Sequence, residues 1–141
     1  MSFTQQYGHA ASEQLDRFIA LGLEEDIGEG DVTSLALIPA EATASFAFRA
    51  RQEMVVSGLF LVPKVYAALA KQMGATLPPK VTAHCEDGDI IAKGETMMTV
   101  SGNAHLLLTG ERLALNLLQR LCGVATHTAR YVAEVQGTNC V

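Results

Sequence analysis

The stretch GERLALNLLQR, which begins at Gly110, carries polar side chains suited to anion binding within a leucine-rich pattern. Arg112, Asn116 and Gln119 recur at i, i+4 and i+7, which places them on one stripe of a helix. If the helix begins near Gly110, its dipole disfavours Arg112 by about 0.3–1 kcal/mol. A charge-assisted hydrogen bond to a carboxylate or phosphate contributes more, about 1.5–3 kcal/mol, and helix N-termini bind anions. Spacing alone leaves two interpretations open, an anion receptor or a solvent-facing stripe.

The most acidic stretch is EEDIGEGDVTS, residues 24–34. A calcium loop needs oxygen ligands at alternating positions, but the third and fifth positions counted from Asp26 are Gly28 and Gly30. A phosphate-binding glycine loop follows a strand and opens a helix, whereas this stretch follows a helical pattern. We therefore interpret it as the end of a helix and a turn.

Other candidate residues allow two interpretations each. Arg49 and Arg51 share the polar face of an alternating segment, which is either solvated or an anion patch opposite a partner. His127, within ATHTAR, is expected to pack on its helix or to lie at an interface. The chain has three widely spaced cysteines, Cys85, Cys122 and Cys140. The absence of a C-x-x-C pattern favours reduced structural thiols over a disulfide framework or a zinc site.

Composition limits the kinds of partner. The 141 residues carry a net charge of −5 and no cluster of Lys or Arg, which argues against nucleic-acid and acidic-membrane binding. About half of the residues are hydrophobic (49%), which is enough for one core, but no run reaches the eighteen or so apolar residues of a membrane span. The first residues lack the pattern of a signal peptide. We expect a cytoplasmic protein.

Hydrophobic periodicity predicts an α+β domain followed by a helical tail. A helix capped by Ser12 should bury one face. That face comprises Leu15, Phe18, Ile19, Gly22 and Leu23. The later elements expected are a strand over 42–51, an extended piece over 53–58, a helix from Pro63 to Met73, short strands within 81–102, a helix ended by Gly123 and a second helix ended by Gly137. Turns are expected at Asp87-Gly88 and Lys93-Gly94.

The segment VTAHCEDGDIIAKGETMMTVSG resembles the hairpins of biotinyl and lipoyl carrier domains. Those domains present a modified lysine at the tip of a tight turn. Here Lys93 lies in an AKGE turn, outside the usual flanking pattern. We keep the hairpin as an expectation of architecture, and a non-catalytic carrier or binding module remains an alternative function.

Two longer stretches, EEDIGEGDVTS and LTGERLALNLLQRLCGVATHTARYV, resemble the N-terminal signatures of the quinolinate phosphoribosyltransferases. RARQEMVVSGL and CEDGDIIAKGE fit the same family between them, in order, so the resemblance covers nearly the whole chain. Cys122 stands where the family more often has serine.

The resemblance implies a fold and a reaction. The fold is α+β: an N-terminal α/β lid and dimerisation domain of hammerhead or barrel-sandwich type over 1–110, then a helical connection over 111–141. Two C-terminal helices would lead into an incomplete α/β barrel that is absent from this chain. The reaction converts quinolinate and phosphoribosyl pyrophosphate, with Mg²⁺, to nicotinate mononucleotide, pyrophosphate and CO₂.

The resemblance also implies how the chain takes part. The family works as a homodimer or higher homo-oligomer, and the arginine of its G-E-R motif, here Arg112, reaches the quinolinate carboxylates in the neighbouring subunit. The phosphate and metal ligands belong to the barrel, so we expect no catalytic residue and no bound metal in this chain, and no activity from the chain alone. A related protein of molybdenum transport is the alternative within the wider group, but it carries Trp-Lys where this chain has Glu111-Arg112.

Overall fold

The computed structural model describes residues 9–27 and 38–138. Its elements in chain order are α2 (His9–Ile27), β1 (Thr43–Arg49), β2 (Met54–Val55), α4 (Leu61–Gln72), β3 (Lys80–Ala83), β4 (Ile90–Ile91), β5 (Thr96–Asn103) and α5 (Ala104–Val135). This mixture of helices and small antiparallel sheets confirms the predicted α+β class.

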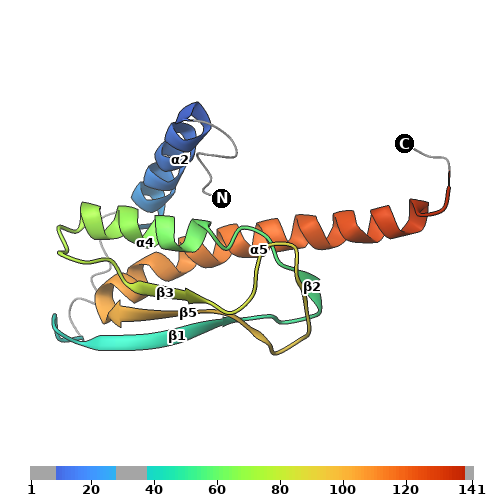
Figure 1. The fold of residues 1–141 in the computed structure, drawn as a ribbon. Coiled ribbons are helices and arrows are strands. Elements are labelled where there is room, and N and C mark those ends of the chain that lie inside the picture. Colours follow the sequence, from blue (N-terminus) through green and yellow to red (C-terminus); the bar gives the residue numbers. More distant parts are fainter. Residues whose placement is uncertain (1–8, 28–37, 139–141) are drawn as a thin grey trace.

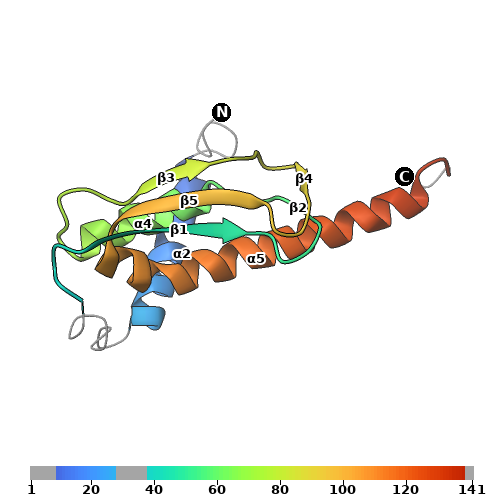
Figure 2. The same ribbon diagram turned by 90° about the horizontal axis from the view of Figure 1, so that it is seen from below.

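The described elements form layers (Figure 1). A three-stranded sheet has the order β1-β5-β3, and α4 and α5 lie side by side against one of its faces. Helix α2 packs on the outer side of α4 and α5. Seen from below, α5 runs along the sheet and continues well past it toward the C-terminus (Figure 2). The main core lies between the sheet and the two helices.

The predicted strand over 42–51 is confirmed as β1, which pairs with β5 in antiparallel register. Its side chains alternate because successive residues of a strand point to opposite faces. Phe48 is 4% exposed and Phe46 is half-buried, whereas Ser45 and Arg49 are exposed. This alternation places Arg49 on the solvated side of the strand.

A second, two-stranded sheet of β2 and β4 extends the same ribbon. The two sheets are joined at Ala50, whose N–H donates to Glu95 and whose carbonyl accepts from Gly94. The expected turns are confirmed, since Gly88 and Gly94 have φ angles of 103° and 91°, which favour glycine.

Helix α4 matches the helix predicted from Pro63 to Met73, with Pro63 in its first turn. Its central contact with α5 is made by Tyr66, which is fully buried and donates its hydroxyl to the Leu107 carbonyl at 3.2 Å. Burial, with a smaller contribution from Glu111, raises the pKa of Tyr66, so the hydroxyl remains a neutral donor. A Cβ on Gly110 would lie 2.6 Å from the Tyr66 ring. The glycine of the G-E-R motif therefore serves helix packing.

The prediction of two C-terminal helices is wrong, because α5 is one continuous helix of 32 residues. It begins at Ala104, six residues before Gly110, and Asn103 caps it by accepting hydrogen bonds from the N–H groups of His105 and Leu106. Gly123 does not end the helix. An interior glycine costs only about 1 kcal/mol, and packing of Cys122 and its neighbours against β2 outweighs this.

The predicted first helix exists, but two details are wrong. Ser12 lies inside α2, which already includes His9, so Ser12 is not its N-cap. Phe18 is 56% exposed, whereas Ile19 and Leu23 are each 1% exposed. The buried stripe follows i, i+4 spacing through these two residues, and Phe18 is turned about 100° away from Ile19. Most of the acidic stretch, residues 28–34, lies outside the described residues.

The expected division at 110/111 falls inside α5 and stays a prediction. Of the helices that the structure describes, none has both the length and the apolar character that a membrane-spanning helix needs.

The glycine at the α4–α5 contact can be tested by substitution. Gly110→Ala should reduce the free energy of unfolding by about 1–3 kcal/mol, because the added methyl group overlaps the Tyr66 ring inside a packed core. Gly123→Ala in the same helix is the matched control, since its Cβ would meet no atom within 4 Å, and it should be neutral or stabilise by up to about 1 kcal/mol. Urea denaturation followed by circular dichroism measures both, and equal effects would contradict the packing role of Gly110.

Candidate functional site

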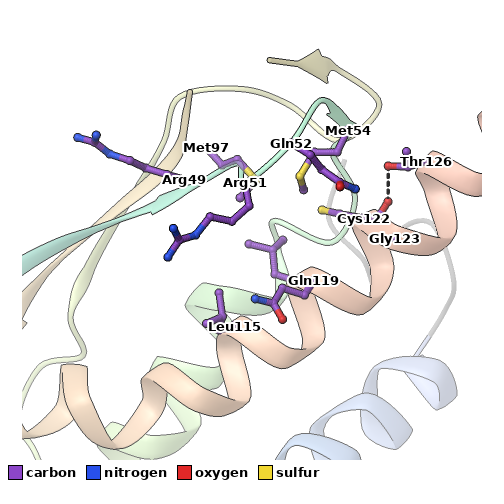
Figure 3. Close-up of a pocket in the computed structure, with 11 residues that line it drawn as sticks. Arg49, Arg51, Gln52, Met54, Met97, Leu115, Gln119, Cys122, Gly123 and Thr126 are labelled. Atoms are coloured by element: carbon purple, nitrogen blue, oxygen red, sulfur yellow. Dashed lines mark hydrogen bonds between the residues drawn. The ribbon is translucent and has the colours of Figure 1, made fainter. Parts of the chain in front are cut away.

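A cleft lies between β1, the loop that follows it, and α5; we call it the β1–α5 cleft. It consists of two neighbouring cavities of about 200 and 470 Å³. Both are lined by Arg49, Arg51, Leu115 and Gln119. Figure 3 shows Arg51 reaching from the loop toward α5, whereas the guanidinium of Arg49 points away from the helix. The cleft is thus bounded by strand and loop cations on one side and by helix side chains on the other.

The cleft combines an apolar floor with a cationic rim. In the smaller cavity, the floor includes Met54, Met97 and Leu118, and the amides of Gln52 and Gln119 supply donors and acceptors. In the larger cavity, Lys93 adds a third cation and Glu111 the only carboxylate among the lining residues. An apolar floor below guanidinium groups suits a small flat organic anion.

Sequence reasoning found only part of this cleft. It singled out Arg49 and Arg51 as a pair and Gln119 as part of the polar stripe, but it connected neither with the other. The sequence pattern points to Lys93 only as a carrier lysine, and it gives no signal at Gln52. The missing information was the packing of β1 beside α5, which brings together residues about 70 positions apart.

Arg112 lies outside this cleft, on the side of α5 that faces α2. Its side chain is 76% exposed, and its Nη1 lies 3.4 Å from Oδ1 of Asp26, which is 17% exposed. Asp26 stands in the last turn of α2, where a helix dipole disfavours a carboxylate, so the arginine is suitably placed to compensate it. This partner is 86 positions away, and neither interpretation of the sequence included it.

The predicted position of Arg112 in the first helical turn is wrong. Counting from Ala104, it is the ninth residue of α5. The dipole effect falls off within the first turn, so neither the expected penalty nor the expected anion site at a helix N-terminus applies to this side chain. What remains is an exposed guanidinium with one long contact.

The predicted polar stripe is confirmed as far as exposure is concerned. Arg112, Asn116 and Gln119 are all exposed, and among them only Gln119 lines the β1–α5 cleft. His127 is exposed as well, so it does not pack within the described part of the chain. Its role at an interface stays a prediction.

Helix α5 is fastened to β2 beside the cleft by two buried side chains. Oγ1 of Thr126 accepts from the Val55 N–H at 2.9 Å and donates to the Cys122 carbonyl at 2.6 Å. Sγ of Cys122 accepts from the Ser57 N–H at 3.3 Å and donates to the Ser57 carbonyl at 3.4 Å. Burial raises the pKa of the Cys122 thiol, so it stays protonated and can donate. This is the structural thiol that the sequence predicts.

Comparison with known proteins decides the family. The sequence model described as "Quinolinate phosphoribosyl transferase, N-terminal domain" matches residues 31–122, well over half of the chain. The chain belongs to this family. The match includes β1, the loop with Arg51, the G-E-R motif and Cys122.

Two individual relatives carry names that agree with this family assignment. The chain is 34% identical over 128 residues to the chloroplastic carboxylating nicotinate-nucleotide pyrophosphorylase of Arabidopsis thaliana, covering 90% of this chain and 35% of the relative. It is 35% identical over 115 residues to a mitochondrial decarboxylating quinolinate phosphoribosyltransferase of Nicotiana glauca, covering 81% of this chain and 31% of the relative.

Two solved structures share the fold. NadC from Streptococcus pyogenes has a TM-score of 0.78 at 29% identity, covering 89% of this chain and 42% of that one. The nicotinate-nucleotide pyrophosphorylase from Ehrlichia chaffeensis has a TM-score of 0.72 at 28% identity, covering 97% of this chain and 43% of that one. The chain thus spans about a third of the length of the two curated relatives and under half of the two solved structures.

Within residues 9–27 and 38–138, no three His, Cys, Asp or Glu side chains gather in a way that could hold a metal ion. The described residues therefore offer no cluster of three side-chain ligands for Mg²⁺. Metal ligands elsewhere in the protein stay a prediction, and no step below is assigned to Mg²⁺.

The contact between Arg112 and Asp26 should contribute little to stability. Ion pairs that are this exposed contribute about 0.2–1 kcal/mol at most, because water screens them. A double-mutant cycle with Arg112→Ala and Asp26→Asn, read by urea denaturation, should give a coupling energy in that range. The Lys64–Asp16 pair, another exposed contact at 3.1 Å, is the matched control. A clearly larger coupling for Arg112 alone would mean that its role is structural.

Proposed function

We propose that this chain is the N-terminal part of a carboxylating nicotinate-nucleotide pyrophosphorylase of NAD biosynthesis. The enzyme would convert quinolinate and phosphoribosyl pyrophosphate to nicotinate mononucleotide, pyrophosphate and CO₂. The observation that carries the proposal is the family match over residues 31–122, which includes the G-E-R motif. The names and solved structures of the relatives support it.

Arg112 is the side chain that we propose binds a quinolinate carboxylate in the site of a neighbouring subunit. Its exposure supports this role, because a guanidinium that is 76% exposed can reach a surface outside its own chain. Its single contact at 3.4 Å is longer than a strong charge-assisted hydrogen bond of about 2.7–2.9 Å. A ligand carboxylate can therefore replace Asp26 with better geometry and little loss.

The β1–α5 cleft supplies a second group of cations that we propose serves the same negatively charged substrates. Loss of CO₂ leaves negative charge on the pyridine ring, and the phosphoribosyl donor is itself an anion. Fixed guanidinium groups stabilise such charge without a nucleophile. Arg51, which reaches into the cleft, is better placed than Arg49.

The assembly and its location complete the proposal. We propose a homodimer in which this domain closes over the barrel of its partner. The long part of α5 that continues beyond the sheet is suited to connect the two parts of one subunit (Figure 1). We expect the protein to act in the cytoplasm.

The role of Arg112 predicts a change in substrate requirement. Arg112→Ala should raise the KM for quinolinate about tenfold or more, because one charged hydrogen bond of about 1.5 kcal/mol or more is lost. The KM for phosphoribosyl pyrophosphate should change much less. Steady-state kinetics would be measured on a fusion of this chain with the remainder of the Ehrlichia chaffeensis enzyme, joined within α5. Asn116→Ala, one helical turn away, is the control for the fold. An unchanged KM for quinolinate would disprove the assignment of Arg112.

The chain alone should show no transferase activity, because we propose that the phosphate and metal ligands belong to the part of the family's proteins that lies beyond it. The purified 141-residue chain would be incubated with quinolinate, phosphoribosyl pyrophosphate and Mg²⁺, and released pyrophosphate would be measured. The active fusion serves as the positive control. Pyrophosphate release by the chain that depends on quinolinate would contradict this division of the site.

A further inference from the structure

The two edges of β2 are paired in different ways. Along one edge, β2 pairs with β4, and this pairing continues where the Val56 N–H donates to the Asp89 carbonyl at 2.9 Å. Gly88 in turn donates to the Val56 carbonyl at 2.8 Å. The N–H groups of Val55 and Ser57 point the opposite way, because backbone donors alternate along a strand. These two donors meet no strand.

Side chains of α5 take the place of the missing strand. The Val55 N–H donates to Thr126 Oγ1 and the Ser57 N–H to Cys122 Sγ, as described above. The spacing of the two elements makes this possible. One turn of a helix advances about 5.4 Å, and two residues of a strand advance about 6.6 Å. Side chains at i and i+4 of α5 therefore match donors at i and i+2 of an extended segment.

The contact between α5 and the segment of Val55 and Ser57 is buried and closely packed. Cys122 is 1% exposed and Thr126 is 8% exposed. A Cβ on Gly58 would overlap Leu121 Cδ1, so the segment approaches α5 closely. Gly58 also has a φ of 92°, which favours glycine. We call the four hydrogen bonds of Thr126 and Cys122 the α5 clasp. The clasp gives a structural reason for two residues of the C-G-V-A-T sequence, Cys122 and Thr126.

The clasp lies directly beside the cleft arginine. The loop that carries Arg51 is fixed at its start by the two hydrogen bonds of Ala50 and at its end by the clasp. Cys122 and Thr126 themselves line the smaller cavity together with Arg51 (Figure 3). The distance between the loop wall and the helix wall of the cleft therefore depends on the clasp.

We propose that Thr126 and Cys122 are positioning residues for Arg51: they pair the free edge of β2 and thereby set the cationic wall of the β1–α5 cleft against α5. The positional part of this inference stands on the hydrogen bonds alone. Only the use of the positioned Arg51 for a substrate anion rests on the proposed function.

The test compares Thr126→Val, which keeps the shape and removes the hydroxyl, with Thr126→Ser, which keeps the hydroxyl. Thr128→Val, at an exposed site two residues further along α5, is the matched control. In the 141-residue chain, amide hydrogen exchange by NMR should be about fivefold faster or more at Val55 in Thr126→Val, since the hydrogen bond of the Val55 N–H is lost. Thr126→Ser should restore slow exchange, and Thr128→Val should leave it unchanged.

The chemical shift of the Arg51 Nε–H resonance, measured in the same ligand-free samples, reports whether the Arg51 side chain has moved. It should shift in Thr126→Val and stay in place in Thr126→Ser and Thr128→Val. A loss of global stability alone would accelerate amide exchange throughout the core. It would not account for a shift of the Arg51 resonance in Thr126→Val only. Unchanged exchange at Val55, or an unmoved Arg51 resonance in Thr126→Val, would overturn the inference.

A titration with benzene-1,2-dicarboxylate separates this inference from the proposed function. Binding that moves the Arg51 resonance and weakens severalfold in Thr126→Val would support both. If the dicarboxylate leaves Arg51 unmoved in the unmodified chain, the substrate role of the cleft is wrong, and the exchange and resonance results still decide the positioning role by themselves.

Discussion

The 32-residue helix α5 contacts every other layer of the domain, and the rest of the structure depends on how closely those layers approach it. Gly110 lets the Tyr66 ring lie against its backbone, and Gly22 of α2 faces Leu113 at a similarly short distance. On the third side, Gly58 brings the segment after β2 against Leu121. A glycine at each contact removes the Cβ that would otherwise hold the layers apart.

Two sides of α5 carry the candidate functional residues. The side toward the sheet carries Gln119 and the clasp residues and bounds the β1–α5 cleft. The side toward α2 carries Arg112 beside Asp26. Helix α5 carries Arg112 and is clasped to the segment that follows Arg51, so it holds the proposed ligand-binding cations in a fixed relation.

Family membership and the local geometry support each other at the G-E-R motif. The glycine is needed for packing against Tyr66, and the arginine two positions later is exposed and only weakly paired. Packing therefore accounts for Gly110, whereas the one contact of Arg112 among the described residues, with Asp26, is long and exposed and contributes little to the fold. The proposed binding of a carboxylate from outside the chain supplies a reason for the arginine.

The sequence by itself determined the α+β class, the alternation of β1, and the turns at Gly88 and Gly94. These features depend on periodicity and on local backbone chemistry, which are written in neighbouring residues. Only the tertiary structure decided that α5 is continuous through Gly123. The free-energy cost of an interior glycine is small compared with the stabilisation that the packing of Cys122 and Thr126 provides. The tertiary structure also decided that Arg51 and Gln119 face one cleft and that Asp26 meets Arg112, since contacts between residues tens of positions apart leave no signal in local spacing.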